Sequence, residues 1–144
     1  MNTEHTLVRH GVRNYPPRQD SVPAARRWAA WMAVAWGEPR VAADVALVTS
    51  ELFTNALLHG AVRDRYLRVE VRLDGAVIRI AVTDPKGERW PEVREAGEEE
   101  QYGRGLAVVN AVARRWGASR LVVGKTVWAE CALPGPDRAG PDPV

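Results

Sequence analysis

Two runs of alternating apolar and polar residues, joined by one tight turn, constrain the fold of this chain more than any other feature. In YLRVEVRLDGAVIRIAVTD (66–84), apolar residues occupy nearly every second position on both sides of Asp74-Gly75. This alternation is typical of strands with one buried face, and Asp-Gly is a favoured hairpin turn. The segment therefore predicts an antiparallel β-hairpin, which argues against a nucleotide fold built from βαβ units.

Two helices are predicted before the hairpin. The first spans residues 21–36, with Ser21 as its N-cap and Gly37 at its end. Its apolar residues recur at helical spacings, so we expect its tryptophans to lie in the core: Trp28, Trp31 and Trp36. The second helix is predicted from residue 39 to residue 59 and is apolar nearly all round.

The C-terminal half predicts a long loop followed by a helix and two strands. Residues 85–105 are rich in Pro, Gly and Glu without clear periodicity, which indicates a loop. Residues 106–117 have apolar residues at helical spacing and predict a third helix. Two strands are then expected around Gly124-Lys125, and a short first strand is expected near residues 6–10.

This order of elements predicts an α/β (α+β) two-layer sandwich, in which helices cover one face of a mixed or antiparallel sheet. With 144 residues, the chain can form one compact core but is short for two domains. We expect a single domain over residues 1–133 and a flexible Pro- and Gly-rich tail over residues 134–144.

Composition argues against several classes of protein. The net charge is only +2 and the basic residues are dispersed, so a direct nucleic-acid partner is not expected. No uninterrupted apolar run approaches the roughly 18 residues of a membrane span, so we expect a cytoplasmic protein that does not enter a membrane. Cys131 lies in an apolar run, where it is expected to be a small buried hydrophobe.

The second predicted helix contains two polar residues one turn apart, in the stretch ELFTNALLHG (51–60). Glu51 and Asn55 are expected on one side of this helix, in a core-facing stripe with Leu47, Val48 and Leu58. A carboxylate in such a stripe needs a cation, a donor or water as its partner. The pair is compatible with a buried hydrogen-bond network or with a functional site, and this segment alone favours the former.

Two later motifs bear on this choice. Asp84 ends a predicted strand and Gly87 follows in a DxxG pattern, which can place a carboxylate beside a flat, amine-bearing ring. Gly103 and Gly105 come directly before the third predicted helix, where free amide groups suit a phosphate. Each motif is weak by itself.

Taken together and in this order, the three motifs resemble the ATP-binding boxes of the histidine-kinase-like ATPase superfamily, the Bergerat ATP fold. The nearest likeness is to anti-sigma-factor serine/threonine kinases and their stand-alone actinobacterial relatives. It is carried by ELFTNALLHG, VTDPKG, GRGLAVVNAVARRWG and GKTVWAEC, and it extends from about Ser21 to Leu133. The resemblance implies an α/β sandwich in which the helix with ELFTNALLHG faces ATP beneath a lid.

The resemblance also implies a role for each matched residue. Asn55 would hold Mg²⁺ against the phosphates of ATP, and Glu51 would be the general base for phosphoryl transfer. The residues implied around the adenine are Asp84, Gly87 and Thr126. The residues implied at the phosphates are Gly103, Arg104 and Gly105.

The function implied by the resemblance is that of an anti-sigma factor with ATP-dependent protein serine/threonine kinase activity towards an antagonist protein. The alternative is a nucleotide-gated interaction module that binds ATP without transferring phosphate. In either case the expected partner is a sigma factor, an anti-sigma antagonist or both, and a homodimer is compatible with the resemblance.

Overall fold

The structure, a computed structural model, describes residues 8–59, 65–84, 106–120 and 125–134. Its helices are α1 (Ser21–Ala35), a 3₁₀ turn η2 (Pro39–Val41), α2 (Ala42–His59) and α4 (Ala107–Val112). Its strands are β1 (Val8–Tyr15), β2 (Leu67–Asp74), β3 (Val77–Asp84), β4 (Arg115–Arg120) and β5 (Lys125–Ala132). The predicted loop at residues 85–105 and all but the first residue of the predicted tail lie outside the described residues.

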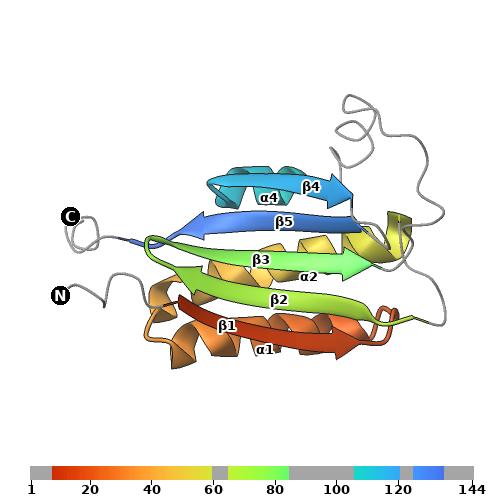
Figure 1. Cartoon of the computed structure of the whole chain (residues 1–144), viewed down its shortest axis with the longest axis horizontal. Coiled ribbons are helices and arrows are strands. Elements are labelled where there is room, and N and C mark those ends of the chain that lie inside the picture. Colours follow the sequence, from red (N-terminus) through yellow and green to blue (C-terminus); the bar gives the residue numbers. More distant parts are fainter. Residues whose placement is uncertain (1–7, 60–64, 85–105, 121–124, 135–144) are drawn as a thin grey trace.

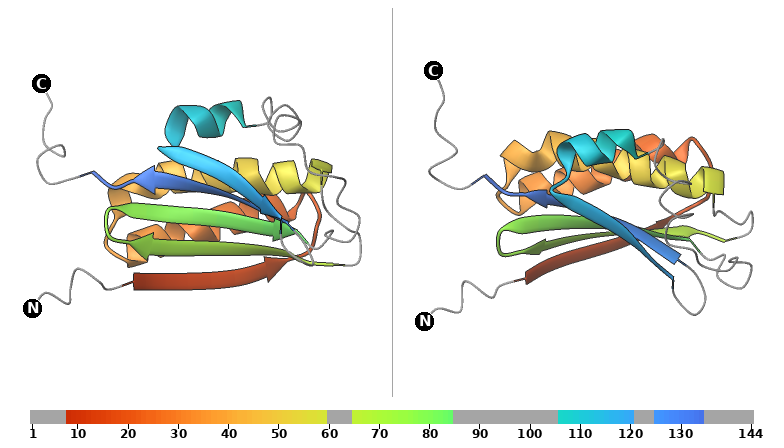
Figure 2. Two further views of the ribbon diagram at one scale, coloured as in Figure 1. Left: turned by 45° about the horizontal axis from the view of Figure 1, so that its top comes forward. Right: turned by 90° about the horizontal axis from the view of Figure 1, so that it is seen from above.

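The five strands form one antiparallel sheet in the order β1-β2-β3-β5-β4. The helices α1, α2 and α4 all lie on one face of this sheet, as the views in Figures 1 and 2 show. The predicted two-layer sandwich is therefore confirmed. We call the sheet face that these helices do not cover the open face.

The predicted hairpin forms as expected. Strands β2 and β3 pair antiparallel, and the turn between them includes Gly75, whose φ of 65° favours glycine. Their alternating apolar side chains point towards the helices and are buried there; they include Leu67, Val69, Val71, Ile78, Ile80 and Val82. Because successive strand residues face opposite sides, the polar residues of the same strands lie on the open face.

Helix α2 is the central element of the helical layer. It packs against α1 and α4 on its flanks and against β3 and β5 of the sheet. Within Pro39–His59, the most apolar window of 18 residues has a mean hydropathy of 1.4, so by length and composition this segment could cross a membrane. Its contacts with four other elements and its buried residues, such as Leu52 and Phe53, identify it instead as a core helix.

Helix α1 is close to its predicted extent. It ends before Gly37, whose φ of 87° confirms the predicted role of glycine as its terminator. Its N-cap is Asp20 rather than Ser21, which is the first helical residue and is buried. The expectation that all three tryptophans are core residues was wrong for Trp31, which is 63% exposed. The buried stripe of α1 is made of alanines instead: Ala25, Ala29 and Ala33.

The third predicted helix is much shorter than expected. Helix α4 ends at Val112, and the chain is already extended at Ala113. Residues 115–120 form β4, and the amide of Arg114 donates to the carbonyl of Glu130, 2.7 Å away. Pairing with β5 supplies main-chain hydrogen bonds along β4, and these outweigh the helical pattern that predicted a helix up to residue 117.

The first strand is longer than predicted and lies further along the chain. Strand β1 covers residues 8–15 and pairs with all of β2. The prediction for Cys131 is confirmed, since its side chain is buried in β5. Burial raises the pKa of the Cys131 thiol to about 12, so the thiolate is disfavoured at neutral pH.

An ion pair joins β4 and β5 on the open face. The guanidinium of Arg115 donates to Glu130 from Nε to Oε1 at 2.8 Å and from Nη2 to Oε2 at 3.4 Å. These hydrogen bonds lower the pKa of the Glu130 carboxyl below its usual value of 4.5. Because the pKa of Glu130 is lower in the folded than in the unfolded protein, its ionised carboxylate stabilises the folded state. This stabilisation is fully present at pH values above the unfolded-state pKa.

We therefore expect the stabilisation from Glu130 to be lost as the pH falls from about 4.5 through the lowered pKa of the folded state. Glu130→Gln should unfold at lower urea concentration than the wild type at neutral pH, and the difference should shrink in acid. Urea unfolding of both proteins over this pH range tests this. Glu38→Gln is the control, because Glu38 has no ion-pair partner among the described residues. A constant difference for Glu130→Gln at every pH would contradict the assignment.

Candidate functional site

The buried amide of Asn55 is the most unusual polar group in α2. The residue is 3% exposed, and neither its Oδ1 nor its Nδ2 has a hydrogen-bond partner among the described residues. An unpaired buried polar group typically costs about 1–3 kcal/mol of stability. Such a group in a core helix suggests a site that a ligand completes.

Glu51 lies one turn before Asn55 at the edge of the buried stripe. Its side chain is half-buried, whereas Val48 and Leu52 next to it are fully buried. The predicted core-facing stripe was partly wrong, because Leu47 is exposed and Leu58 is 72% exposed. At about 100° per residue, Leu47, Glu51 and Leu58 share one flank of the helix. Glu51 can therefore contact solvent or substrate while Asn55 cannot reach bulk water.

Asp84 is the last residue of β3 and continues its buried face. Positions 78, 80, 82 and 84 alternate towards the helices, and Asp84 is buried like the three apolar residues before it. In the register of β3 and β5, Asp84 is opposite Lys125, which is also buried. Two ionisable residues therefore lie side by side under the helical layer. Burial of two such residues is uncommon in a core unless they are paired or serve a site.

The end of α2 reaches this same region. Figure 1 shows the C-terminal end of α2, the end of β3 and the start of β5 at the same end of the sheet. The last residue of α2, His59, is close enough to Lys125 that the ammonium charge affects its titration. Burial and this charge both lower the pKa of His59, so the imidazole is neutral at neutral pH. The candidate site thus combines Asn55, His59, Asp84 and Lys125.

Lys125 is a residue that sequence reasoning missed. It occurs within the motif GKTVWAEC, but no role was assigned to it. Its position opposite Asp84 follows from the pairing of β3 with β5, two strands that are separated in the sequence by residues 85–124. The sequence did contain a signal for its burial. Lys125 begins a strand with apolar residues at alternate positions, and the strand period places it on the same buried face as Val127 and Ala129.

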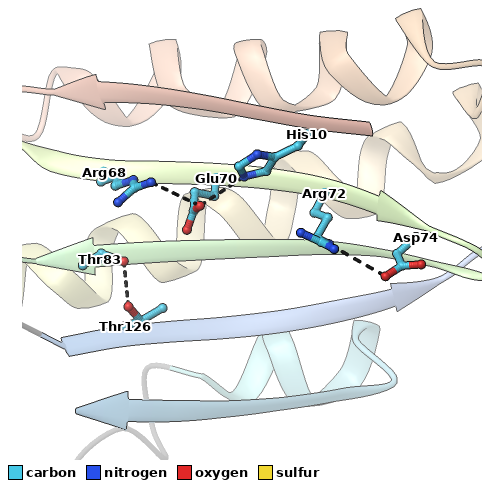
Figure 3. A network of polar contacts seen from close by, with 7 residues as sticks. All are labelled: His10, Arg68, Glu70, Arg72, Asp74, Thr83 and Thr126. Carbon is cyan, nitrogen blue, oxygen red and sulfur yellow. Dashed lines mark hydrogen bonds and ion pairs between the residues drawn. The ribbon is translucent and has the colours of Figure 1, made fainter. Parts of the chain in front are cut away.

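Thr126 lies on the other side of the sheet from these residues. Because Lys125 points towards the helices, Thr126 points to the open face, where its Oγ1 is 2.7 Å from Oγ1 of Thr83. Figure 3 shows the two hydroxyl groups facing each other across β3 and β5. The structure therefore brings Asn55 and Asp84 to the same end of the helical face but separates Thr126 from them.

The remaining predicted site residues are outside the described part of the chain: Gly87, Gly103, Arg104 and Gly105. Within residues 8–59, 65–84, 106–120 and 125–134, no three His, Cys, Asp or Glu side chains are grouped so as to hold a metal ion.

Comparisons with known proteins agree with this fold. A structure of the RsbU and RsbW domains of Rv1364c from Mycobacterium tuberculosis has a similar fold, with a TM-score of 0.65 and 18% identity over 87% of this chain. This chain spans only 32% of the length of that protein. No curated protein matches at a significant level. The family model for the histidine kinase-like ATPase domain matches residues 15–130. This match covers most of the chain and confirms the resemblance seen in its motifs, so the protein belongs to the histidine kinase-like ATPase family.

Proposed function

We propose that this protein is an ATP-binding regulator of the anti-sigma-factor type, with serine/threonine kinase activity towards an anti-sigma antagonist protein in the cytoplasm. The observation that carries the proposal is the buried amide of Asn55, which has no hydrogen-bond partner among the described residues. It lies in the motif ELFTNALLHG of a histidine kinase-like ATPase domain, at the position that the resemblance assigns to Mg-ATP.

The residues of the candidate site fit a nucleotide with its metal ion. The Oδ1 atom of Asn55 would be a ligand of Mg²⁺, and the carboxylate of Asp84 would accept a hydrogen bond from the adenine amine. Bound Mg²⁺ would offset the negative charge of the phosphates. Gly103, Arg104 and Gly105 would contact the phosphates, and Gly87 would allow close approach to the adenine. Thr126 would not contact the nucleotide, because its side chain is on the open face.

Glu51 is suited to the role of general base. Its carboxylate is half-buried at the edge of α2, one turn from the amide that would hold the metal ion. A base at this position can take the proton of a serine or threonine hydroxyl as that oxygen attacks the terminal phosphate and the bond to ADP breaks. The alternative function, a nucleotide-gated interaction module, needs Asn55 and Asp84 but not this step.

A groove beside α1 is suited to binding a protein partner. Trp31 and Val34 are exposed on α1, and a groove of about 1030 Å³ runs between this helix and the end of β1. Its apolar floor includes Trp28, and its rim carries Arg13 and Arg27. Exposed tryptophan and arginine are the residue types that most often dominate binding energy at protein interfaces. The positive rim favours a partner with an acidic surface.

Mg-ATP should stabilise the wild-type protein by about 2.7 kcal/mol at a hundred times its dissociation constant. For a domain of this size, the melting temperature should rise by roughly 5–10 °C.

Asn55→Leu should abolish this shift and also raise the stability of the free protein by about 1 kcal/mol, because it removes an unpaired buried group. Asn110→Leu is the control, since the Asn110 amide accepts a hydrogen bond from the Trp116 indole at 2.6 Å. It should retain the Mg-ATP shift without any gain in stability. No Mg-ATP shift in the wild type would remove the nucleotide function.

Glu51→Gln should bind Mg-ATP with nearly wild-type affinity but transfer phosphate about 10²- to 10⁴-fold more slowly, because the amide cannot accept the proton. Phosphorylation of an antagonist recovered from native cells with the wild-type protein measures the transfer, and calorimetry measures the affinity. A wild type that binds ATP and the antagonist but transfers nothing would favour the interaction module. Transfer by Glu51→Gln at the wild-type rate would make Glu51 a structural residue.

Trp31→Ala should weaken binding of the recovered partner by roughly 30-fold or more, the loss expected for a residue at the centre of an interface. Its Mg-ATP shift should not change, because α1 does not carry the candidate site. Val8→Ala is the control, since it removes another exposed apolar side chain, from the start of β1 and outside the groove. Surface plasmon resonance with the partner immobilised gives both affinities. Equal affinities for wild type and Trp31→Ala would exclude the groove as the docking surface.

A further inference from the structure

The open face of the sheet contains a polar pocket that the proposed function does not use. The pocket has a volume of about 400 Å³ and lies over the middle three strands and their neighbours. It is lined by His10, Arg68, Glu70, Arg72, Arg79, Ala81, Thr83, Ser119 and Thr126. Figure 3 shows seven residues of the open face around this region, with their ion pairs and hydrogen bonds.

The register of the sheet explains why a pocket forms here. Ala81 is opposite Glu70 on β2 and Trp128 on β5, so the shortest side chain of this row lies between two longer ones. The rows on either side carry arginines at positions 72 and 79 and threonines at positions 83 and 126. The methyl group of Ala81 is therefore the floor, and longer polar side chains are the walls.

Two arginines of the pocket face each other directly. Arg72 and Arg79 are paired in register across β2 and β3 and point to the same side of the sheet. Like charges at directly opposite positions destabilise a sheet. Arg72 also contacts Asp74, but only at 3.8 Å between Nε and Oδ2. An anion between the two guanidinium groups would remove their repulsion.

The position of Arg79 is fixed by an aromatic ring rather than by a carboxylate. Its Cζ atom lies 4.4 Å from the centre of the Trp128 ring, and the described residues include no carboxylate within ion-pair distance of it. The carboxylate of Glu130, opposite Arg79 in register, is held by Arg115 at 2.8 Å. Stacking on an indole leaves the edge of a guanidinium, with its N–H donors, available for a ligand.

Glu70, the one acidic residue among the described lining residues, already has partners. Oε2 of Glu70 is 3.1 Å from Nε2 of His10 and 3.5 Å from Nη2 of Arg68, as Figure 3 shows. These contacts screen its charge and orient both partners. With three arginines and one glutamate, the lining has a formal charge of +2 when His10 is neutral. The hydroxyl groups of Thr83, Ser119 and Thr126 add neutral donors on the far wall.

We propose that this open-face pocket binds a phosphate-bearing small molecule at a second site, separate from the proposed nucleotide site under the helices. Guanidinium groups bind phosphate oxygens through paired, charge-assisted hydrogen bonds, and two strands present them here from opposite sides. The volume lies in the range of small-molecule sites and is large enough for a diphosphate group with an attached organic part.

Inorganic pyrophosphate is the probe, in buffer with EDTA and without nucleotide, so that no other phosphate compound competes for the pocket. We expect one pyrophosphate to bind the wild-type protein by calorimetry, and both Arg72→Gln and Arg79→Gln to weaken this binding by roughly tenfold or more, as loss of a charge-assisted hydrogen bond predicts. Arg26→Gln is the matched control, because Arg26 is an exposed arginine on α1, far from the open face. It should bind pyrophosphate as the wild type does.

A fluorescence titration locates the bound ligand. Arg79 stacks on Trp128, so pyrophosphate bound to Arg79 should change the tryptophan emission of the wild-type protein. This change should be absent in Trp128→Phe. Binding should persist in Asn55→Leu, so a failure of the proposed nucleotide function leaves this result unaffected. The proposal is overturned if pyrophosphate does not bind the wild type, if Arg26→Gln weakens binding as much as Arg79→Gln does, or if Asn55→Leu abolishes it.

Discussion

The packing of α2 against the sheet is the interaction on which the rest of the structure depends. This helix contacts β3 and β5 below it and α1 and α4 beside it, so it joins the two layers and all of the helices. Fully buried residues such as Val45, Val48 and Phe53 supply the apolar surface, and burial of each contributes about 1.5–3 kcal/mol. The same packing carries Asn55 into the interior.

This packing gives the two faces of the sheet different chemistry. On the helical face, the buried residues of β2, β3 and β5 are apolar except for Asp84 and Lys125 at the ends of their strands. On the open face, arginine and acidic side chains alternate along β2. The open-face residues of β3 and β5 that lie beside them in register are also largely polar. Because the period of a strand is two, a single stretch of sequence encodes both surfaces. The proposed nucleotide site and the open-face pocket are therefore on opposite sides of the same two strands.

The features that were predicted correctly depend on neighbours close in sequence. The alternation in residues 66–84 established the hairpin, and Gly37 marked the end of α1, because strand period and left-handed glycine are local properties. The incorrect predictions concern residues whose structure depends on segments distant in the sequence. Residues 115–117 belong to the predicted third helix but are the start of β4, since pairing with β5 decides their conformation. Trp31 matched the apolar pattern of α1, yet none of the described elements covers it.

The candidate site likewise has some features that are local in the sequence and others that depend on tertiary contacts. The sequence by itself determined that Glu51 and Asn55 share one side of a helix, that Asp84 ends a strand, and that the motifs belong together. Only the tertiary structure decided that Asn55 is buried without a partner among the described residues, that Lys125 lies opposite Asp84, and that Thr126 faces away from both. The physical reason is that helical and strand periods fix the relative direction of side chains within one element, whereas burial and pairing depend on which distant elements pack against it.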